Sequence, residues 1–300
     1  MAMREDFCAF ILTHGRPDRV HTYNTLLKAG YTGKIYIVID DEDKTAYEYR
    51  KRFGDKVIQF CKREVAEWTD DGDNFGIRGV VYARNVCWEL AEQVGVKYFI
   101  VLDDDYTGFE LRHRADGSGC YLAVQHTIDH IIAAMVEFLR STETKTIAMA
   151  QGGDFIGGSV NGNPRGLRRK AMNTFACATD RPFKFFGHIN EDVSAYVTEG
   201  RKGKLFFTVM TPKVVQVTTQ QNAGGLTEFY LDVGTYVKSF YSVMYAPSCV
   251  TIGLMGDPRG IACRIHHKIN WHRTAPKILR EQHKKPVNRQ SPSGTTLNGS

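Results

Sequence analysis

Residues 98–105 read YFIVLDDD, an apolar run that ends in three consecutive carboxylates. The run from Tyr98 to Leu102 has the length and content of a buried strand. Adjacent carboxylates repel each other, so they are tolerated where a cation neutralises them, and hard oxygen ligands suit Mg2+ or Mn2+. The triplet therefore indicates a divalent metal held at a strand end. The alternative is an exposed polar turn that merely ends the strand.

Strands of the same kind precede this one and alternate with helices. The strands are expected at 7–12 and 34–40, and the helices at 18–29, before Gly30, and at 80–94, before Gly95. This alternation at short spacing predicts an α/β fold with a mostly parallel sheet flanked by helices. In such sheets ligands bind beyond the carboxyl ends of the strands, so the site is expected where the loops 13–19, 40–43 and 103–105 meet.

The second half of the chain is less regular. It is expected to hold a helix over 122–140, a strand over 146–150, a long loop or hairpin over 151–166, and a β-hairpin over 204–219 that turns at Thr211 and Pro212. We predict one domain over 1–283, with a nucleotide-binding half over 1–110 and a mixed acceptor-side and catalytic half over 111–283. The composition of 284–300 predicts a flexible basic tail.

The bulk composition excludes several classes of protein. At 300 residues and 42% hydrophobic content the chain can bury a full core. Its 7 cysteines lie far apart and form no CxxC pair, so neither a disulfide framework nor a zinc knuckle is indicated. No apolar run approaches the roughly 18 residues that cross a bilayer. We therefore expect a soluble, cytoplasmic protein with no membrane partner.

The net charge of +6 is concentrated near the C-terminal end. From Asp257 onward the sequence contains nine lysines and arginines but only two acids. Such a basic patch is the electrostatic footprint of a protein that binds a polyanion, for example nucleic acid. The alternative is a solvated tail.

Common nucleotide-binding and hydrolase motifs are absent, because the sequence contains no GxxxxGK[ST], GxGxxG, HExxH or GxSxG. Four segments instead resemble the nucleotide-sugar half of GT-A glycosyltransferases. They are THGRPDR at 13–19, IVIDD at 37–41, GIRGVVYARN at 76–85 and FIVLDDD at 99–105. In this resemblance residues 103–105 correspond to the DxD motif of that superfamily.

The resemblance implies a UDP-sugar donor and a Mn2+ or Mg2+ ion. Asp105, and Asp103 directly or through water, would bind the metal that bridges the donor diphosphate, and Asp104 would face the sugar or ribose. The other donor-binding residues would be Thr13, Arg16 and Asp41 around the uridine, His14 beside them, and Arg84 at the diphosphate or sugar. The alternatives are that Arg16 only staples a turn and that Arg84 simply forms a salt bridge.

A second acidic pair, Glu191 and Asp192, follows an aromatic loop. Sugar transfer by direct displacement needs a base near the acceptor hydroxyl, and a carboxylate partly desolvated by aromatic rings suits that role. Many inverting GT-A enzymes have such a pair at the matching point, so the resemblance assigns the base to Asp192, with Glu191 beside it, and implies inversion. Retention is the alternative mechanism, and the alternative role of the pair is to complement a helix dipole.

Two tandem histidines supply a further candidate ligand. The GT-A superfamily often takes one more metal ligand from a histidine late in the chain, and either His266 or His267 is suitably placed. On a strand their side chains point to opposite faces, so one of them is expected to point inward.

The opening THGRPDR, the compact size and the lack of membrane helices resemble the TET-associated glycosyltransferases of phages and kinetoplastids. This resemblance implies transfer to 5-hydroxymethylcytosine or 5-hydroxymethyluracil in double-stranded DNA, in a bacterial or phage-infected cytoplasm. An enzyme that acts on a base in a duplex flips it out and holds the backbone with cations. The candidate DNA-binding cations are Arg165, Arg168, Arg169, Lys170, Arg201, Lys202 and Lys204, next to the aromatic cluster Phe183, Phe185 and Phe186.

Other functions are compatible with the same residues. The chain could be a soluble GT-A enzyme with a saccharide, lipid or protein acceptor, or a nucleic-acid-binding module without catalysis. In those cases the cations form a solvated face and the phenylalanines belong to the core.

Overall fold

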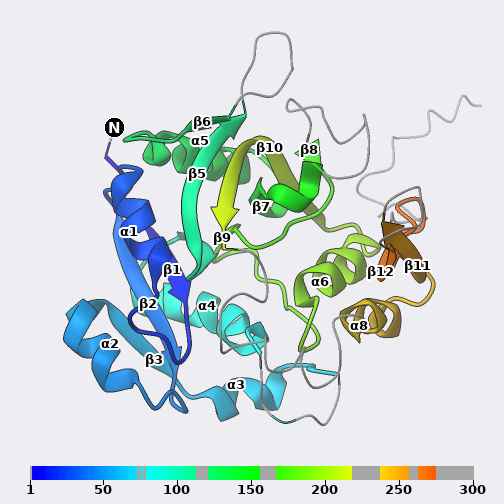
Figure 1. The fold of residues 1–300 in the computed structure, drawn as a ribbon, viewed down its shortest axis with the longest axis horizontal. Coiled ribbons are helices and arrows are strands. Elements are labelled where there is room, and N and C mark those ends of the chain that lie inside the picture. The colour runs from blue at the N-terminus through cyan, green and yellow to red at the C-terminus, as the bar shows by residue number, and fades with distance from the viewer. Residues whose placement is uncertain are drawn as a thin grey trace, which may run out of the picture.

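The central strands are apolar on both sides, and each side packs under its own layer of helices (Figure 1). The computed structural model describes residues 2–72, 76, 79–112, 121–155, 167–217, 237–256 and 263–274. Alternate residues of β1 (Phe7–Leu12) belong to two different cores. A strand that is buried on both faces reads as a continuous apolar run, which explains the runs in the sequence.

Helices of the described segments cover both faces of the sheet. One face is covered by α1 (His21–Lys28), α2 (Ala46–Phe53) and α5 (Ile128–Ser141), and the other by α3 (Lys62–Trp68), α4 (Val81–Gln93) and α6 (Glu191–Gly200). The result is a three-layer α/β/α arrangement, and the predicted α/β class is confirmed.

The first half of the sheet is parallel, as predicted. Its order is β3 (Val57–Phe60), β2 (Lys34–Asp40), β1 and β4 (Tyr98–Asp103). The three expected strands are confirmed, and β3 is an additional short strand. Because these strands run in the same direction, the loops that follow β1, β2 and β4 meet at one edge of the sheet.

The second half of the sheet is mixed. Its strands are β5 (Tyr106–Arg112), β6 (Tyr121–Ala123), β7 (Thr144–Ala150), β8 (Leu167–Arg168), β9 (Phe175–Ala178) and β10 (Leu205–Gln216). Strand β9 runs antiparallel between β4 and β7, while β10 pairs in parallel with β7 and antiparallel with β5. Of two short 3-10 helices, η1 (Gly54–Lys56) precedes β3 in the first half and η2 (Gly152–Phe155) follows β7 in the second.

The hairpin predicted over 204–219 is wrong. Residues Leu205–Gln216 form one strand, β10, whose register shifts between Val209 and Lys213. The shift contains Pro212, which lacks an N–H and is therefore accommodated in a strand at a bulge rather than in a regular ladder.

Two predicted helices begin later than expected. Helix α5 begins at Ile128 instead of 122, because Tyr121–Ala123 pairs with β5 as β6. Helix α1 begins at His21 instead of 18, because a turn closes first between the Arg19 N–H and the Arg16 carbonyl. Of the loop expected over 151–166, the described part contains η2, and residues 156–166 lie outside the described residues, as does the predicted tail at 284–300.

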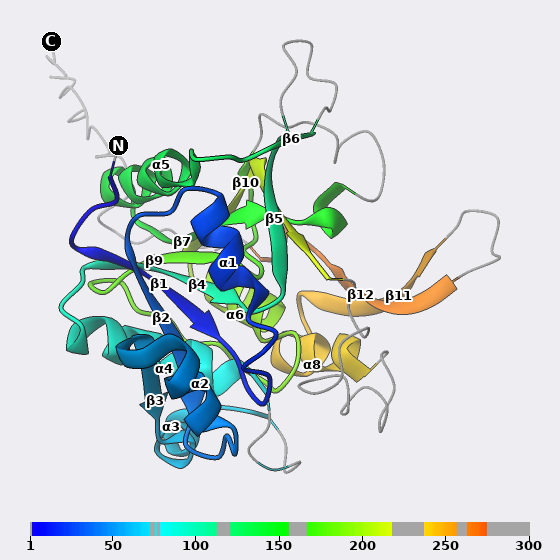
Figure 2. The same cartoon turned by 60° about the vertical axis from the view of Figure 1, so that its left-hand side comes forward.

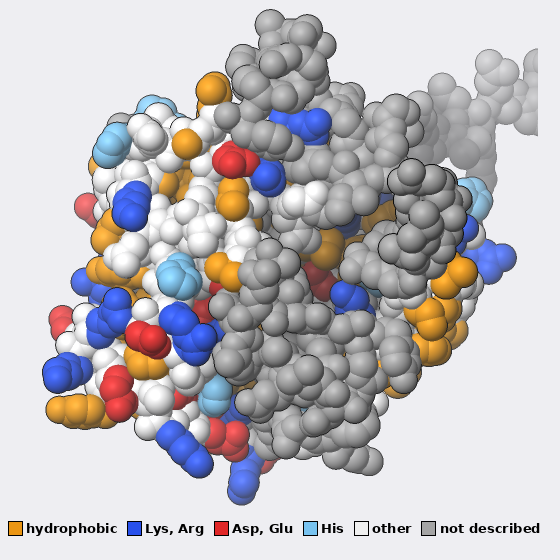
Figure 3. All heavy atoms as spheres, viewed as in Figure 1, with side chains coloured by type: hydrophobic (Ala, Val, Ile, Leu, Met, Phe, Trp, Pro, Cys, Tyr) orange, Lys and Arg blue, Asp and Glu red, His pale blue; other side chains and the backbone are white. Residues whose placement is uncertain are grey.

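A separate unit lies beside the main sheet. The strands β11 (Val250–Gly256) and β12 (Cys263–Ile269) form a two-stranded sheet that packs against α8 (Val237–Tyr245) and projects from the body in Figure 2. Apolar side chains gather over this unit at the right-hand edge of Figure 3, and its exposed members are Phe240, Met244, Ile252, Leu254 and Ile265. None of the helices in the described segments has the length and apolar character needed to cross a membrane.

The two glycines that follow α1 and α4 lead to a prediction of unequal destabilisation. Gly30 has φ +84° and Gly95 has φ +70°, so an alanine at either position is strained. A Cβ at Gly30 would also lie 2.4 Å from the Cα of His126, whereas nothing lies within 4 Å at Gly95. We expect Gly95→Ala to lower the free energy of unfolding by about 1–2 kcal/mol. Gly30→Ala should cost roughly 2 kcal/mol more, because the backbone at His126 must move.

Urea unfolding of the two variants, followed by far-UV circular dichroism, measures this difference. Equal losses of stability in the two variants would contradict the packing of Gly30 against His126.

Candidate active site

The aspartate turn at 103–105 is held in place by a buried threonine of α1. The Thr22 hydroxyl donates to the Asp103 carbonyl at 2.5 Å and accepts from the Tyr106 N–H at 2.9 Å. The Thr22 N–H donates to the Asp104 carbonyl at 3.1 Å. These three hydrogen bonds fix the direction in which the aspartates leave β4.

Asp104 points back into the protein. Its carboxylate is 2% exposed, accepts a hydrogen bond from the Thr13 hydroxyl at 2.6 Å and pairs with Arg16 Nε at 2.9 Å. Burial raises the pKa of Asp104, against the opposing charge of Arg16. Asp104 was expected to face the sugar or ribose, but in this structure its carboxylate anchors the loop after β1. The alternative in which Arg16 staples a turn describes this contact.

The loops after β1 and β2 are also joined. The Asp43 carboxylate accepts from the Gly15 N–H at 2.8 Å, and His14 Nδ1 lies 2.8 Å from an Asp40 oxygen. This hydrogen bond to Asp40 raises the pKa of His14, whose side chain is half-exposed. Asp41 is exposed and accepts from the Lys62 N–H at 2.9 Å, at the start of α3. The predicted convergence of the three loops at one edge is therefore confirmed.

Asp103 and Asp105 present the oxygens that suit a cation. Burial, followed by the charges of Asp103 and Asp104, raises the pKa of Asp105 to about 7. In the described part of the chain no ion pair neutralises Asp105, and the charge of Arg16 offsets the effect of burial only in part, so a cation would stabilise its negative charge. Two partly buried carboxylates with hard oxygen donors fit Mn2+ or Mg2+.

The two histidines do not complete that site. Within the described residues, no three His, Cys, Asp or Glu side chains lie close enough together to hold a metal. His267 on β12 is instead 3.2 Å from the Asn190 side-chain nitrogen, and burial, followed by the charge of His266, lowers the pKa of His267 to about 3. The predicted set of Asp103, Asp105 and either His266 or His267 is thus not assembled among the described residues, and the two histidines lie on a sheet separate from the one that contains β4.

A buried arginine links the aspartate turn to the second acidic pair. Arg84 on α4 is 3% exposed and pairs with Glu191 through Nη1 and with Asp103 through Nη2, the latter at 3.2 Å. Burial opposes its charge, yet Glu191 and Asp103 together raise the pKa of Arg84. Arg84 forms the salt bridge that the alternative described, and this salt bridge joins both halves of the site, while its contact with the donor stays a prediction.

Glu191 and Asp192 begin α6, as the helix-dipole alternative required. Both are buried, and burial raises the pKa of each carboxyl group. Their environments differ. Glu191 pairs with Arg84, whereas the Asp192 carboxylate accepts a hydrogen bond from the Val193 N–H at 2.7 Å. Asp192 is therefore the carboxylate of the pair that makes no ion pair in the described part of the chain, although the charge of Arg84 also acts on it.

Sequence reasoning missed the residue that turns the chain into α6. Asn190 has φ 53°, in the left-handed region, and its side chain donates to the Lys238 carbonyl at 2.7 Å. Asparagine tolerates this conformation better than most residues, so an asparagine directly before an acidic pair was the available signal. Thr22 and Asp43 were also missed, and single threonines and aspartates carry no comparable signal.

Most of the predicted DNA-binding cations are engaged within the protein. Lys202 and Lys204 both pair with Glu199, and they hold its pKa below the usual value although burial alone would raise it. Arg169 donates to the carbonyls of Gly200 and Thr274, and Lys170 pairs with buried Asp154. Arg168 lies on β8 and Arg201 follows α6, while Arg165 lies outside the described residues.

The aromatic cluster belongs mainly to the core. Phe183 and Phe185 are 5% and 1% exposed and pack against Trp88, so the core interpretation is correct for both.

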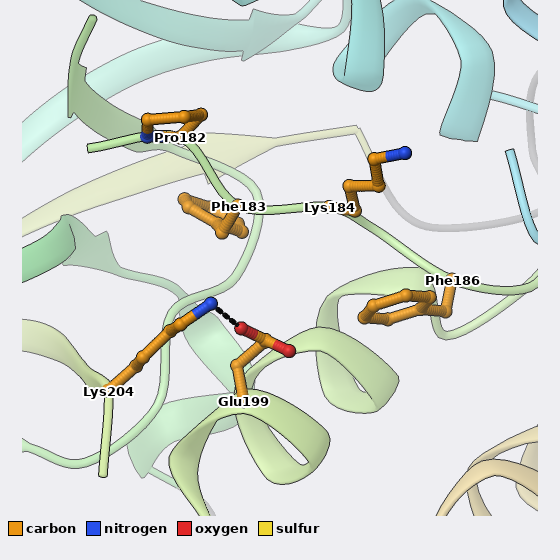
Figure 4. A pocket seen from close by; sticks show the side chains of 6 residues that line it. All are labelled: Pro182, Phe183, Lys184, Phe186, Glu199 and Lys204. Carbon is orange, nitrogen blue, oxygen red and sulfur yellow. Dashed lines mark hydrogen bonds and ion pairs between the residues drawn. The ribbon is translucent and has the colours of Figure 1, made fainter. Parts of the chain in front are cut away.

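Phe183 and Phe186 do line a hollow of about 320 Å³ with Lys204 and other residues (Figure 4). Glu199 of this hollow lies seven residues after Asp192, about 10 Å along the helix axis. The hollow therefore belongs to the opposite end of α6 from the acidic pair.

Comparison with known proteins gives one family match. The family model described as TET-Associated Glycosyltransferase matches residues 7–225. Two solved structures are similar at low identity. Glucosyl-3-phosphoglycerate synthase from Mycobacterium tuberculosis, in complex with Mn2+, uridine diphosphate and phosphoglyceric acid, has 8% identity and a TM-score of 0.43, over 88% of this chain and 87% of that chain. S. aureus TarS 1–349 has 12% identity and a TM-score of 0.41, over 79% and 65%. No curated protein matches.

The buried pair of Arg84 and Glu191 leads to a prediction about stability. Arg84→Met leaves the Glu191 carboxylate buried without its cation, and we expect the free energy of unfolding to fall by about 3–5 kcal/mol. The double variant Arg84→Met with Glu191→Gln should be more stable than Arg84→Met alone, because it removes the unpaired charge. Urea unfolding midpoints measure both effects.

The surface pair of Arg140 and Glu137, whose side chains are 49% and 64% exposed, provides the control. Arg140→Met should change the stability by less than about 1 kcal/mol. If adding Glu191→Gln to Arg84→Met brought no recovery, the pair would not be a charge-compensating contact.

Proposed function

The chain belongs to the TET-associated glycosyltransferase family and is a nucleotide-sugar-dependent hexosyltransferase, and we propose that its acceptor is a hydroxymethylated pyrimidine in DNA. One observation carries the proposal: Arg84 makes an ion pair with each of two acidic groups. These groups are the turn at 103–105 and the pair at 191–192. One group suits a donor diphosphate with its metal, and the other suits an acceptor hydroxyl.

We propose that a UDP-sugar binds beyond the carboxyl ends of β1, β2 and β4. His14 and Asp41 are the accessible side chains of this edge and would contact the uridine. Thr13 and Arg16 would act indirectly, because their side chains bind the Asp104 carboxylate and so set the position of the loop after β1. Asp104 is then a positioning residue for the donor rather than a contact of the sugar.

Asp103 and Asp105 would hold Mn2+ or Mg2+, with the remaining positions left to water and the donor diphosphate. Such an ion would neutralise charge on the leaving diphosphate. Arg84 pairs with Asp103 and orients that carboxylate. The raised pKa of Asp105 supports this assignment, since its carboxylate makes no ion pair in the described part of the chain.

Asp192 would be the catalytic base. In the proposed inverting reaction its carboxylate takes the proton of the acceptor hydroxymethyl group, whose oxygen bonds to the anomeric carbon while the bond from that carbon to the UDP oxygen breaks. A base needs a free carboxylate, and Glu191 is held by Arg84 whereas Asp192 is not. Burial raises the pKa of Asp192, which makes its carboxylate a stronger base.

The DNA acceptor is supported by the family description and by the basic C-terminal segment, where the exposed Lys268 and Arg273 belong to the described residues. The pairing of Lys170, Lys202 and Lys204 within the protein favours the alternative of a saccharide, lipid or protein acceptor. These two acceptor classes differ in salt dependence, because binding to DNA weakens steeply with added salt.

Direct transfer assays test the acceptor. We expect the protein, with a UDP-sugar such as UDP-glucose and Mn2+, to add one hexose to oligonucleotides that contain 5-hydroxymethylcytosine or 5-hydroxymethyluracil. Nucleoside masses after digestion measure the addition, and EDTA should abolish it. Unmodified DNA is the control. Transfer to a saccharide but to neither modified DNA would contradict the proposed acceptor.

Replacing the proposed base tests the mechanism. We expect Asp192→Asn to lower kcat for transfer by roughly 10²–10⁴-fold, because a general base contributes about that factor. UDP-sugar binding, measured by calorimetry, should change little. Val193→Ala, at the next position of α6, is the control for local packing. If Asp192→Asn kept more than a tenth of the wild-type kcat, another group would be the base.

A further inference from the structure

Three carboxamide side chains meet at the carboxyl end of the sheet. Gln151 follows β7, Asn173 precedes β9 and Gln216 ends β10, and these three strands are neighbours in the sheet (Figure 1). The Asn173 side-chain NH2 group donates to Gln151 Oε1 at 2.7 Å and to Gln216 Oε1 at 2.8 Å. We call this group the amide cluster. All three side chains are partly exposed.

The amide cluster lies directly beside the aspartate turn. Gln216 pairs with Tyr106 across β10 and β5, and the N–H of the next residue, Val217, donates to the Asp105 carbonyl at 3.2 Å. The Tyr106 hydroxyl donates to the Asn173 carbonyl at 2.9 Å. The cluster is therefore tied through two hydrogen bonds to residues 105 and 106.

Asn173 is held in a costly backbone conformation. Its φ is 62°, and among the described residues other than glycine only His126 and Asn190 also have positive φ. Asn190 is the residue that leads into the acidic pair. Left-handed conformations persist where the surrounding structure imposes them, and they cluster at functional sites. The strain at Asn173 directs its side chain between the two glutamines.

The cluster offers an acceptor and a donor. Both hydrogens of the Asn173 NH2 group are used, which leaves its Oδ1 as an acceptor. The Gln216 Nε2 group has no partner among the described residues, and Gln151 Nε2 makes only a weak contact with the Met172 sulfur at 3.5 Å. The Watson–Crick edge of a pyrimidine presents both donors and acceptors, so an amide acceptor near an amide donor can form hydrogen bonds with it.

We propose that the amide cluster is the subsite that reads the Watson–Crick edge of the acceptor pyrimidine after it leaves the DNA stack. Asn173 and Gln216 contact the base, and Gln151 positions Asn173. The inference rests on the proposed DNA acceptor and adds to it the residues that choose between the two pyrimidines. Neutral amides suit this task because cytosine and uracil differ in their donor and acceptor pattern and not in charge.

The test compares two acceptors in variants of the full chain. Gln216→Met removes the amide at nearly constant size, and Asn173→Gly removes the side chain while allowing positive φ. Gln93→Met, at an exposed position of α4, is the matched control. The measurements are kcat/KM for oligonucleotides that contain 5-hydroxymethylcytosine or 5-hydroxymethyluracil, the KM of the UDP-sugar, and the melting temperature.

We expect kcat/KM for the preferred pyrimidine to fall at least tenfold in both variants, and the ratio between the two pyrimidines to move toward one. The KM of the UDP-sugar should stay within twofold. An equal fall for both pyrimidines, or a change confined to the KM of the UDP-sugar, would overturn the inference. If the wild-type protein glycosylates neither DNA, the proposed acceptor itself is wrong. If it glycosylates one of them and the variants behave like Gln93→Met, only the base subsite is wrong.

Discussion

The buried guanidinium of Arg84 is the contact on which the arrangement of the site depends. It lies between Glu191 and Asp103, and its centre is 4.9 Å from the ring of Phe175 and 5.7 Å from the ring of Phe185. A charge that is shielded from water has to keep its anions close. Arg84 therefore fixes the positions of α4, β4 and α6 relative to one another, although α6 is far from the other two in sequence. The two acidic groups of the site both contact its guanidinium.

Compensation of charge also separates the carboxylates into two kinds. Asp104 and Glu191 each have an arginine partner and serve the structure. Asp105 and Asp192 have no ion pair in the described part of the chain, although burial raises the pKa of both. Buried carboxylates without a cation of their own are unfavourable unless a ligand completes them. This supports our proposals that Asp105 binds the metal together with Asp103 and that Asp192 takes the proton.

The recognition that we propose for the acceptor base differs from the one that the cationic segments indicated. Lys170, Lys202 and Lys204 are already paired with acids of the same chain, so they contribute little free positive charge to a phosphate backbone. The amide cluster beside Asp105 carries no charge, and its groups form directional hydrogen bonds. Phosphate contacts position a nucleic acid, whereas contacts to base edges select the base. The groups for which we propose base selection lie at the ends of β7, β9 and β10.

The amino-acid sequence by itself determined three strands of the parallel half, the edge of the sheet at which their loops meet, and the two acidic groups. These features are local, because strand burial and a polar strand end are written in consecutive residues such as 98–105. Only the tertiary structure decided which charges are paired: Arg84 meets Glu191 across 107 positions of the chain, and the histidines of β12 stay apart from Asp103. Pairing is decided by packing between distant elements, and that packing has no periodic signal in the sequence.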